Sequence, residues 1–215
     1  MDESVSLPHA PGGTLTSDTI RGRRGRLDQE AVLQAAEALV DREGYDALTM
    51  TSLAAELEAR VSSLYNHVAN LEDLRALIQI RAMRMLGDHV RSAAMGHSGT
   101  EGLRALSNTL RAFARSHPHR YAALTRPPID REGFYASALE AIEALAVMIR
   151  SAGLPEERML QTAMALFASL HGFVSLEVAG YFGDLSGTKV DVDLDAVYTQ
   201  VIDGAVTAAA LESTH

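Results

Sequence analysis

The order of apolar and polar residues predicts helices from Asp28 onward, and no segment alternates as a strand would. A first helix begins after Asp28, whose carboxylate suits the positive end of the helix dipole, and ends at Gly44. A second short helix is capped by Thr49. After a break near residues 58–60, a third short helix places four apolar residues on one face, namely Val61, Leu64, Tyr65 and Val68.

The rest of the chain is predicted to form a larger helical body. Helices are expected over about residues 71–94, 101–116, 131–152, 155–180 and 194–211, with Pro155 opening the fourth of these and a polar loop over residues 183–193. Residues 120–128 are expected to be a connector with at most one helical turn because they end in two prolines. The fold class is therefore all-α, with a three-helix helix-turn-helix domain at 21–70 and a domain of about six helices at 71–215.

Composition excludes several classes of protein. The 215 residues are 47% apolar and include no cysteine, so structural disulfides, thiolate metal sites and cysteine nucleophiles are absent. No apolar run reaches the roughly 18 residues of a membrane span, and the N-terminal residues lack the pattern of a secretion signal. The expected location is cytoplasmic, with no membrane partner.

The distribution of charge matters more than its sum. A net charge of −9 is unfavourable for binding to phosphates, but four arginines lie within residues 21–26. Residues 1–20, rich in Ser, Thr, Pro and Gly, are predicted to be a disordered tail in front of this cluster. A basic arm on an acidic body is compatible with DNA binding, and a solvated tail is the alternative.

The third helix carries the side chains that best suit a base-reading surface. Asparagine can pair with adenine, arginine with guanine and serine with either base. The polar face of this helix offers these groups in a short span, namely Arg60, Ser62, Ser63, Asn66 and His67. The alternative is an ordinary solvated face of a short helix.

The run LTMTSLAAELEARVSSLYNHVANLEDL, residues 48–74, resembles the signature of the tetracycline-repressor (TetR) family of transcriptional regulators. The matching features are the Leu-Thr opening, the LAAEL of the second helix, and Leu64-Tyr65-x-His67 at the end of the third. The pair Gly44-Tyr45 also fits, so the specific likeness covers residues 27–75. Residues 171–182, HGFVSLEVAGYF, resemble a penultimate-helix segment of one C-terminal subgroup.

This resemblance implies a repressor that binds a palindromic double-stranded DNA operator and is released by a small-molecule effector. Helix four, which begins near Leu71, would then transmit the change. The DNA-contacting residues that it implies are Thr49, Thr51, Ser62, Ser63, Tyr65 and His67, with Asn66 between them and Arg23, Arg24 and Arg26 in the arm. Three residues depart from the family pattern: Glu58 replaces a frequent glycine, Val68 an aromatic, and Leu71 a phosphate-binding lysine.

The body is expected to form a homodimer and to hold the effector. The helix over 155–180 is apolar on most sides and needs more cover than one small domain supplies. The predicted interface residues are Phe173, Leu176, Val197, Val201, Ile202, Ala205 and Ala209. A mainly apolar pocket is predicted from Met83, Phe113, Tyr121, Phe134, Met148, Met164, Phe167 and His171, and ordinary core packing is the alternative for both sets.

Other functions find little support in the sequence. The chain contains no phosphate-binding glycine loop, nucleophile elbow or metal-ligand spacing on ordered helices, so no catalytic residues, metal or cofactor are expected. Two alternatives to effector control stay open. One is a DNA-binding regulator governed by a protein partner, and the other is a helical interaction module that no longer reads DNA.

Overall fold

The computed structural model describes residues 27–154, 156–183 and 192–211, and the side chains of residues 208–211 are not described. The arginines Arg23, Arg24 and Arg26 therefore lie outside the described residues, as do the predicted N-terminal tail, Pro155 and the side chain of Ala209.

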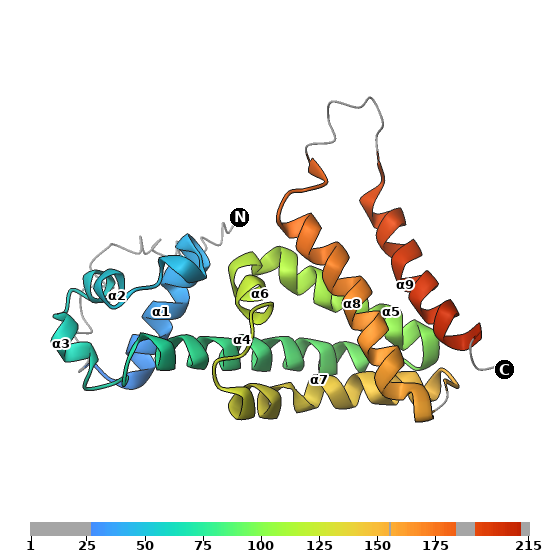
Figure 1. Ribbon diagram of the computed structural model, residues 1–215, viewed down its shortest axis with the longest axis horizontal. Coiled ribbons are helices and arrows are strands. Elements are labelled where there is room, and N and C mark those ends of the chain that lie inside the picture. The colour runs from blue at the N-terminus through green and yellow to red at the C-terminus, as the bar shows by residue number, and fades with distance from the viewer. Residues whose placement is uncertain (1–26, 155, 184–191, 212–215) are drawn as a thin grey trace, which may run out of the picture.

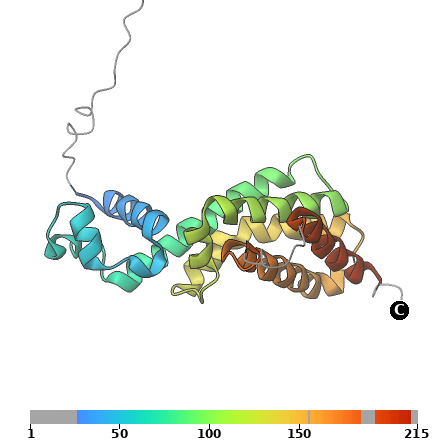
Figure 2. The same ribbon diagram turned by 90° about the horizontal axis from the view of Figure 1, so that it is seen from above.

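Within the described ranges the chain is helical throughout, which confirms the all-α prediction (Figures 1 and 2). Two single 3-10 turns, η2 (Tyr45–Ala47) and η3 (Glu156–Arg158), accompany the α-helices. The α-helices are α1 (Gln29–Glu43), α2 (Met50–Glu56), α3 (Val61–Leu64), α4 (Leu71–Ala94), α5 (Gly99–Ser116), α6 (Pro118–Leu124), α7 (Arg131–Ser151), α8 (Met159–Val178) and α9 (Leu194–Leu211).

Local chemistry sets the ends of the first helices as the sequence predicts. The Asp28 carboxylate accepts a hydrogen bond of 2.8 Å from the backbone N–H of Ala31. Gly44 ends α1 with φ at 95°, a backbone conformation that side chains disfavour. Thr49 and Ser52 cap α2 reciprocally, each side chain accepting from the other's backbone N–H at 3.0 and 2.9 Å.

Two apolar cores divide the molecule along its length. Helices α1 to α3 form a small module at one end of the molecule, and α5 to α9 form the body at the other (Figure 1). The core of the module also includes Leu74 and Ile78 of α4 and Ala123 of α6. The long α4 thus belongs to the module at its start and to the body at its end, so the two parts share a rigid helix.

The prediction that residues 120–128 form a connector with at most one helical turn was wrong, because residues 118–124 form the helix α6. The prolines at 127 and 128 follow the helix instead of interrupting it, and Pro118 takes the first helical position, where its missing N–H costs nothing. Helix α6 packs on α1 and η2 of the module. Arg120 of α6 pairs with Asp41 of α1 at 2.6 Å, and Arg126 pairs with Asp46 at 2.6 Å. The body therefore contacts the module at a second place besides α4.

Two further differences concern the ends of elements. Helix α3 proper ends at Leu64, and residues 65–67 continue as a turn. Tyr65, predicted for the buried face, is 53% exposed, whereas Leu64 is fully buried and Val68 nearly so. The α-helix α8 begins at Met159, after the turn η3.

Candidate nucleic-acid interface and ligand hollow

The helix-turn-helix holds α3 in place from one side only. Leu53 and Ala54 of α2 are buried, as are Leu64 of α3 and Val68 just after it. Arg42 of α1 pairs with Glu56 of α2 at 2.7 Å, which links these two helices at the surface of the module. The opposite side of α3 therefore faces solvent on a rigid support, the arrangement that a base-reading helix requires.

Most of the described polar residues predicted to bind DNA are exposed to solvent. The exposed ones are Thr51, Arg60, Ser62, Tyr65 and Asn66, and Ser63 and His67 are half-buried. Thr49 is exposed but its hydroxyl caps α2. Within the described part of the chain, the side chains of Arg60, Ser62 and Asn66 make no hydrogen bond or ion pair. Unpartnered donors and acceptors on a fixed helix are available for an external partner.

The module itself is acidic. Residues 27–70 contain only two arginines, Arg42 and Arg60, and Arg42 is engaged by Glu43 and Glu56. Against them stand eight carboxylates, at Asp28, Glu30, Glu37, Asp41, Glu43, Asp46, Glu56 and Glu58. Arg60 is thus the one arginine or lysine of residues 27–70 whose side chain is free for a phosphate or a guanine, and the predicted role of the arginines at residues 21–26 lies outside the described residues.

Glu58, in the turn between α2 and α3, has a strained backbone, as expected where the family frequently has a glycine. Its φ is 48°, the only positive value of a non-glycine residue in the described ranges. A residue with a side chain is strained by about 1–2 kcal/mol in this conformation, and glycine would relieve that strain. Glycine is also more flexible in the unfolded chain, which offsets about half of the gain in stability. Glu58→Gly should therefore raise the free energy of unfolding by about 0.5–1 kcal/mol.

Thermal and urea unfolding followed by circular dichroism measures this effect. Glu43→Gly at the end of α1 serves as a control, because a glycine there replaces an ordinary helical residue and should destabilise. A Glu58→Gly chain no more stable than the parent would show that the turn is not strained.

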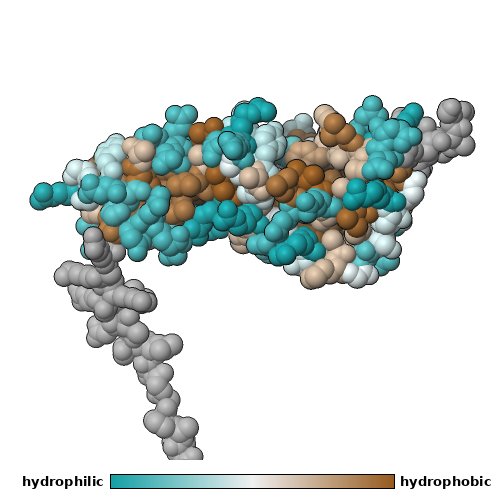
Figure 3. All heavy atoms as spheres, turned by 90° about the horizontal axis from the view of Figure 1, so that it is seen from below, coloured by the Kyte–Doolittle hydropathy of each residue, from teal (hydrophilic) through white to brown (hydrophobic). Residues whose placement is uncertain are grey.

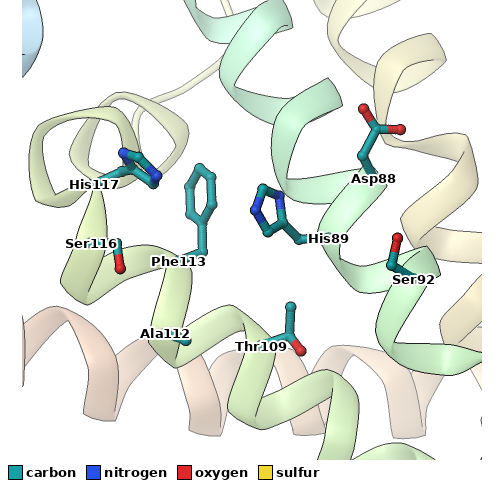
Figure 4. A pocket seen from close by; sticks show the side chains of 8 residues that line it. All are labelled: Asp88, His89, Ser92, Thr109, Ala112, Phe113, Ser116 and His117. Atoms are coloured by element: carbon teal, nitrogen blue, oxygen red, sulfur yellow. The ribbon is translucent and has the colours of Figure 1, made fainter. Parts of the chain in front are cut away.

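The body has an open hollow between α4 and α5, of about 470 Å³ (Figure 4). This volume lies within the range of small-molecule sites. Its lining residues are Asp88, His89, Ser92, Thr109, Ala112, Phe113, Ser116 and His117. Of the residues predicted to bind an effector, only Phe113 lines it. Sequence reasoning assigned neither His89 nor His117 to a ligand site, because a single histidine on a helix or just after its end gives no such signal.

The other predicted effector residues do not surround this hollow. Tyr121 and Met148 are part of the body's core, and Phe134 is buried near the start of α7. Met83 and His171 are half-buried, and Met164 and Phe167 are exposed on α8. His171 is already partnered: its Nδ1 lies 2.8 Å from the Tyr121 hydroxyl, and its ring stacks on Phe167. Burial lowers the pKa of His171 and raises that of Tyr121.

The predicted dimer residues divide between the core and the surface. Phe173 and Ile202 are buried within the core of this chain and are unavailable to a partner. The side chains of Val197, Val201 and Ala205 are half-buried against the same core. Leu176 is 43% exposed near the end of α8. Three large apolar residues are exposed nearer the start of this helix, namely Leu160, Met164 and Phe167.

Helix α8 is also the one described segment whose length and composition would allow it to cross a membrane. The stretch Glu156–Val178 has a mean hydropathy of 1.4. One face of α8 packs into the body through Leu166, Leu170 and Val174, as expected of a core helix. The other face is apolar and is left exposed by the described residues.

The chain resembles known regulators in sequence and in fold. The profile described as "Tetracyclin repressor-like, C-terminal domain" matches residues 103–205. The uncharacterized HTH-type transcriptional regulator Rv0681 of Mycobacterium tuberculosis is 32% identical over 219 residues, covering 100% of this chain and 97% of that protein.

Two solved structures share the fold. The Streptomyces coelicolor TetR family protein ActR, in complex with actinorhodin, is 20% identical with a TM-score of 0.63 and covers 89% of this chain and 100% of its own. BioQ, with its double-stranded DNA operator, is 22% identical with a TM-score of 0.55, over 84% of this chain and 99% of its own. At these identities both likenesses concern the fold alone.

Proposed function

Because the chain belongs to the TetR family of transcriptional regulators, we propose that it is a repressor whose homodimer binds a palindromic operator and releases it when a small molecule binds the body. The observation that carries DNA reading is the open side of α3, where Arg60, Ser62 and Asn66 lie exposed and unpartnered above a buried support. A TetR-fold neighbour with its DNA operator and another with a bound small molecule support the two halves of the proposal. The chain is a regulator and not an enzyme.

The apolar outer face of α8 supports the homodimer. Its centre consists of small residues, Ala165, Ala168 and Gly172, all exposed. A Cβ atom added to Gly172 would meet nothing within 4 Å. Large exposed apolar residues flank these small ones, with Leu160, Met164 and Phe167 on one side and Leu176 on the other. Small residues between large ones let a second helix approach closely, so we assign this face to the α8 of a second subunit.

More apolar surface accompanies the α8 face on the body. The side seen in Figure 3 shows apolar side chains over the body, and exposed members on α7 are Tyr135, Leu139, Ile142 and Val147. Exposed apolar surface of this extent on a regulator is typical of a subunit interface. A two-fold pairing through the body would hold two copies of α3 at a fixed spacing, which matches two half-sites of a palindrome.

The double substitution Ser62→Ala/Asn66→Ala tests DNA reading. The chain is titrated against DNA from its own upstream region, followed by fluorescence anisotropy across a salt series. Loss of two base-contacting groups should weaken binding about 10²-fold while the salt dependence stays nearly unchanged, because no cation is removed.

The matched control is Ser98→Ala/Asn108→Ala, which removes the same exposed residue types at the start of α5 and within it, outside the hollow. This control should bind DNA like the parent. If both double variants bind with the parent's affinity and sequence preference, α3 does not read bases and the proposed interface is wrong. If the parent shows no salt-dependent binding to any selected sequence, the alternative of a helical interaction module takes its place.

A further inference from the structure

The hollow between α4 and α5 has a wall of aromatic rings. Phe113 stands between two imidazoles, with its ring centroid 6.0 Å from that of His89 and 5.2 Å from that of His117 (Figure 4). His89 comes from α4, whereas Phe113 and His117 come from α5 and its end. Rings that border an open space favour a flat aromatic guest, because each offers an edge or a face for stacking.

A backbone contact settles which nitrogen of His89 can accept a hydrogen bond. Its Nδ1 lies 2.7 Å from the carbonyl oxygen of Met85, one turn earlier on α4. A carbonyl oxygen only accepts, so Nδ1 carries the proton and the neutral ring has its lone pair on Nε2. The polar end of this ring is therefore an acceptor. The one carboxylate that lines the hollow, Asp88, also only accepts when ionised.

From these acceptors and rings we propose that the hollow binds a planar aromatic molecule bearing a hydrogen-bond donor, such as a phenolic hydroxyl, which donates to Nε2 of His89. The aromatic body lies against Phe113 and His117. An aromatic carboxylate is disfavoured, because it brings an acceptor and a negative charge to His89 and Asp88. This inference names the ligand class for the effector control proposed above and rests on that function.

The position of the hollow connects it with the DNA-binding module. His117 directly precedes α6, and Arg120 of α6 pairs with Asp41 of α1 and contacts the sulfur of Met85 at 3.5 Å. Asp88 borders both this hollow and a neighbouring one lined by Glu37, Arg81, Arg84, Met85 and Arg120. A guest that shifts His117 therefore acts on the contact between α6 and α1 as well as on α4.

Three probes of one size test the ligand class on the full chain without DNA. They are 2-naphthol, which has the donor, 2-methoxynaphthalene, which lacks it, and 2-naphthoate, which is anionic. Binding is followed by probe fluorescence, since the chain has no tryptophan. We expect 2-naphthol to bind about tenfold more tightly than either of the others, the effect of one well-placed hydrogen bond.

Two variants locate the binding. His89→Phe keeps a ring in the wall but removes the acceptor, so the preference for 2-naphthol should fall to within about twofold. Ala112→Phe fills the hollow and should abolish binding of all three probes, while Asn108→Phe on the same helix should leave it unchanged. The matched control for His89 is His97→Phe at the α4–α5 turn, which should keep the parent's preference.

Equal affinities for 2-naphthol and 2-naphthoate, or a preference that survives His89→Phe, would overturn the inference. So would undiminished binding to Ala112→Phe. These results are independent of the DNA titration, so a parent that binds DNA but shows no probe preference refutes only the ligand class. A parent that binds 2-naphthol as expected but no DNA refutes the proposed function.

Discussion

Arg111→Ala should lower the free energy of unfolding by about 3–5 kcal/mol, a large share of the stability of a protein of this size. Arg111 of α5 is 8% exposed and lies where α5, α8 and α9 meet. Its guanidinium donates to both oxygens of Glu177, at 2.8 and 2.6 Å, and pairs with Asp195 at 2.8 Å. It also lies 4.5 Å from the ring centroid of Tyr198.

The loss is large because of what the substitution leaves behind. The side chain of Glu177 is only 12% exposed and would lose its buried hydrogen-bonding and charge partner in a poorly solvated place. Hydrogen bonding to Glu177 holds the pKa of Arg111 above its usual range, so the guanidinium stays charged at neutral pH. Arg111→Met/Glu177→Leu removes both charges and should recover much of the lost stability.

Urea unfolding followed by circular dichroism at one protein concentration measures this effect. The matched control is Arg104→Ala, which breaks the exposed pair of Arg104 with Asp203, at 2.7 Å between α5 and α9. An exposed pair contributes less than about 1 kcal/mol. Equal losses for the two alanine variants would contradict a special role of the buried pair.

Gly172→Glu should convert the proposed homodimer to monomers and weaken operator binding by at least about 10²-fold, because the two half-sites then bind independently. The residue lies on the exposed α8 face, where an added Cβ atom would meet no described atom within 4 Å. In a helix interior glutamate is favoured over glycine, so the monomer's own fold is retained. Against a second α8, however, the side chain has no room and its charge would be buried.

Light scattering coupled to size-exclusion chromatography gives the oligomeric state, and anisotropy gives the affinity for DNA. Asn108→Glu places the same charge on an exposed position of α5 and should change neither. A dimeric Gly172→Glu chain with the parent's affinity would show that α8 does not form the interface.

The helices and the exposed polar side of α3 could be predicted from the sequence because local chemistry determines them. Caps at Asp28 and Thr49, the stop at Gly44 and the periodic apolar face act within a few residues, and the structure confirms them with the exception of Tyr65, which is exposed. The strain at Glu58 was also foreseeable, since a glycine is usual at that turn. These features need no knowledge of how distant segments pack.

The contacts between distant segments could not be foreseen. A pattern of charges on a helix is the same for a solvated face and for a buried pair, so Arg111 and Arg120 carried no signal. Helix α6 was underestimated because two prolines nearby were taken to break it, whereas they follow its end. The hollow depends on how α4 and α5 are spaced, which the sequence does not show. Of its lining residues only Phe113 was predicted, because it is aromatic.

The most direct test of the account is selection of bound sequences from random double-stranded DNA, with the parent and with Ser62→Ala/Asn66→Ala in parallel. The account predicts that the parent enriches two inverted half-sites at a fixed spacing of about one helical turn or a multiple of it, and that the double variant loses this motif. Enrichment of no motif by the parent, or of the same motif by both proteins, would contradict it.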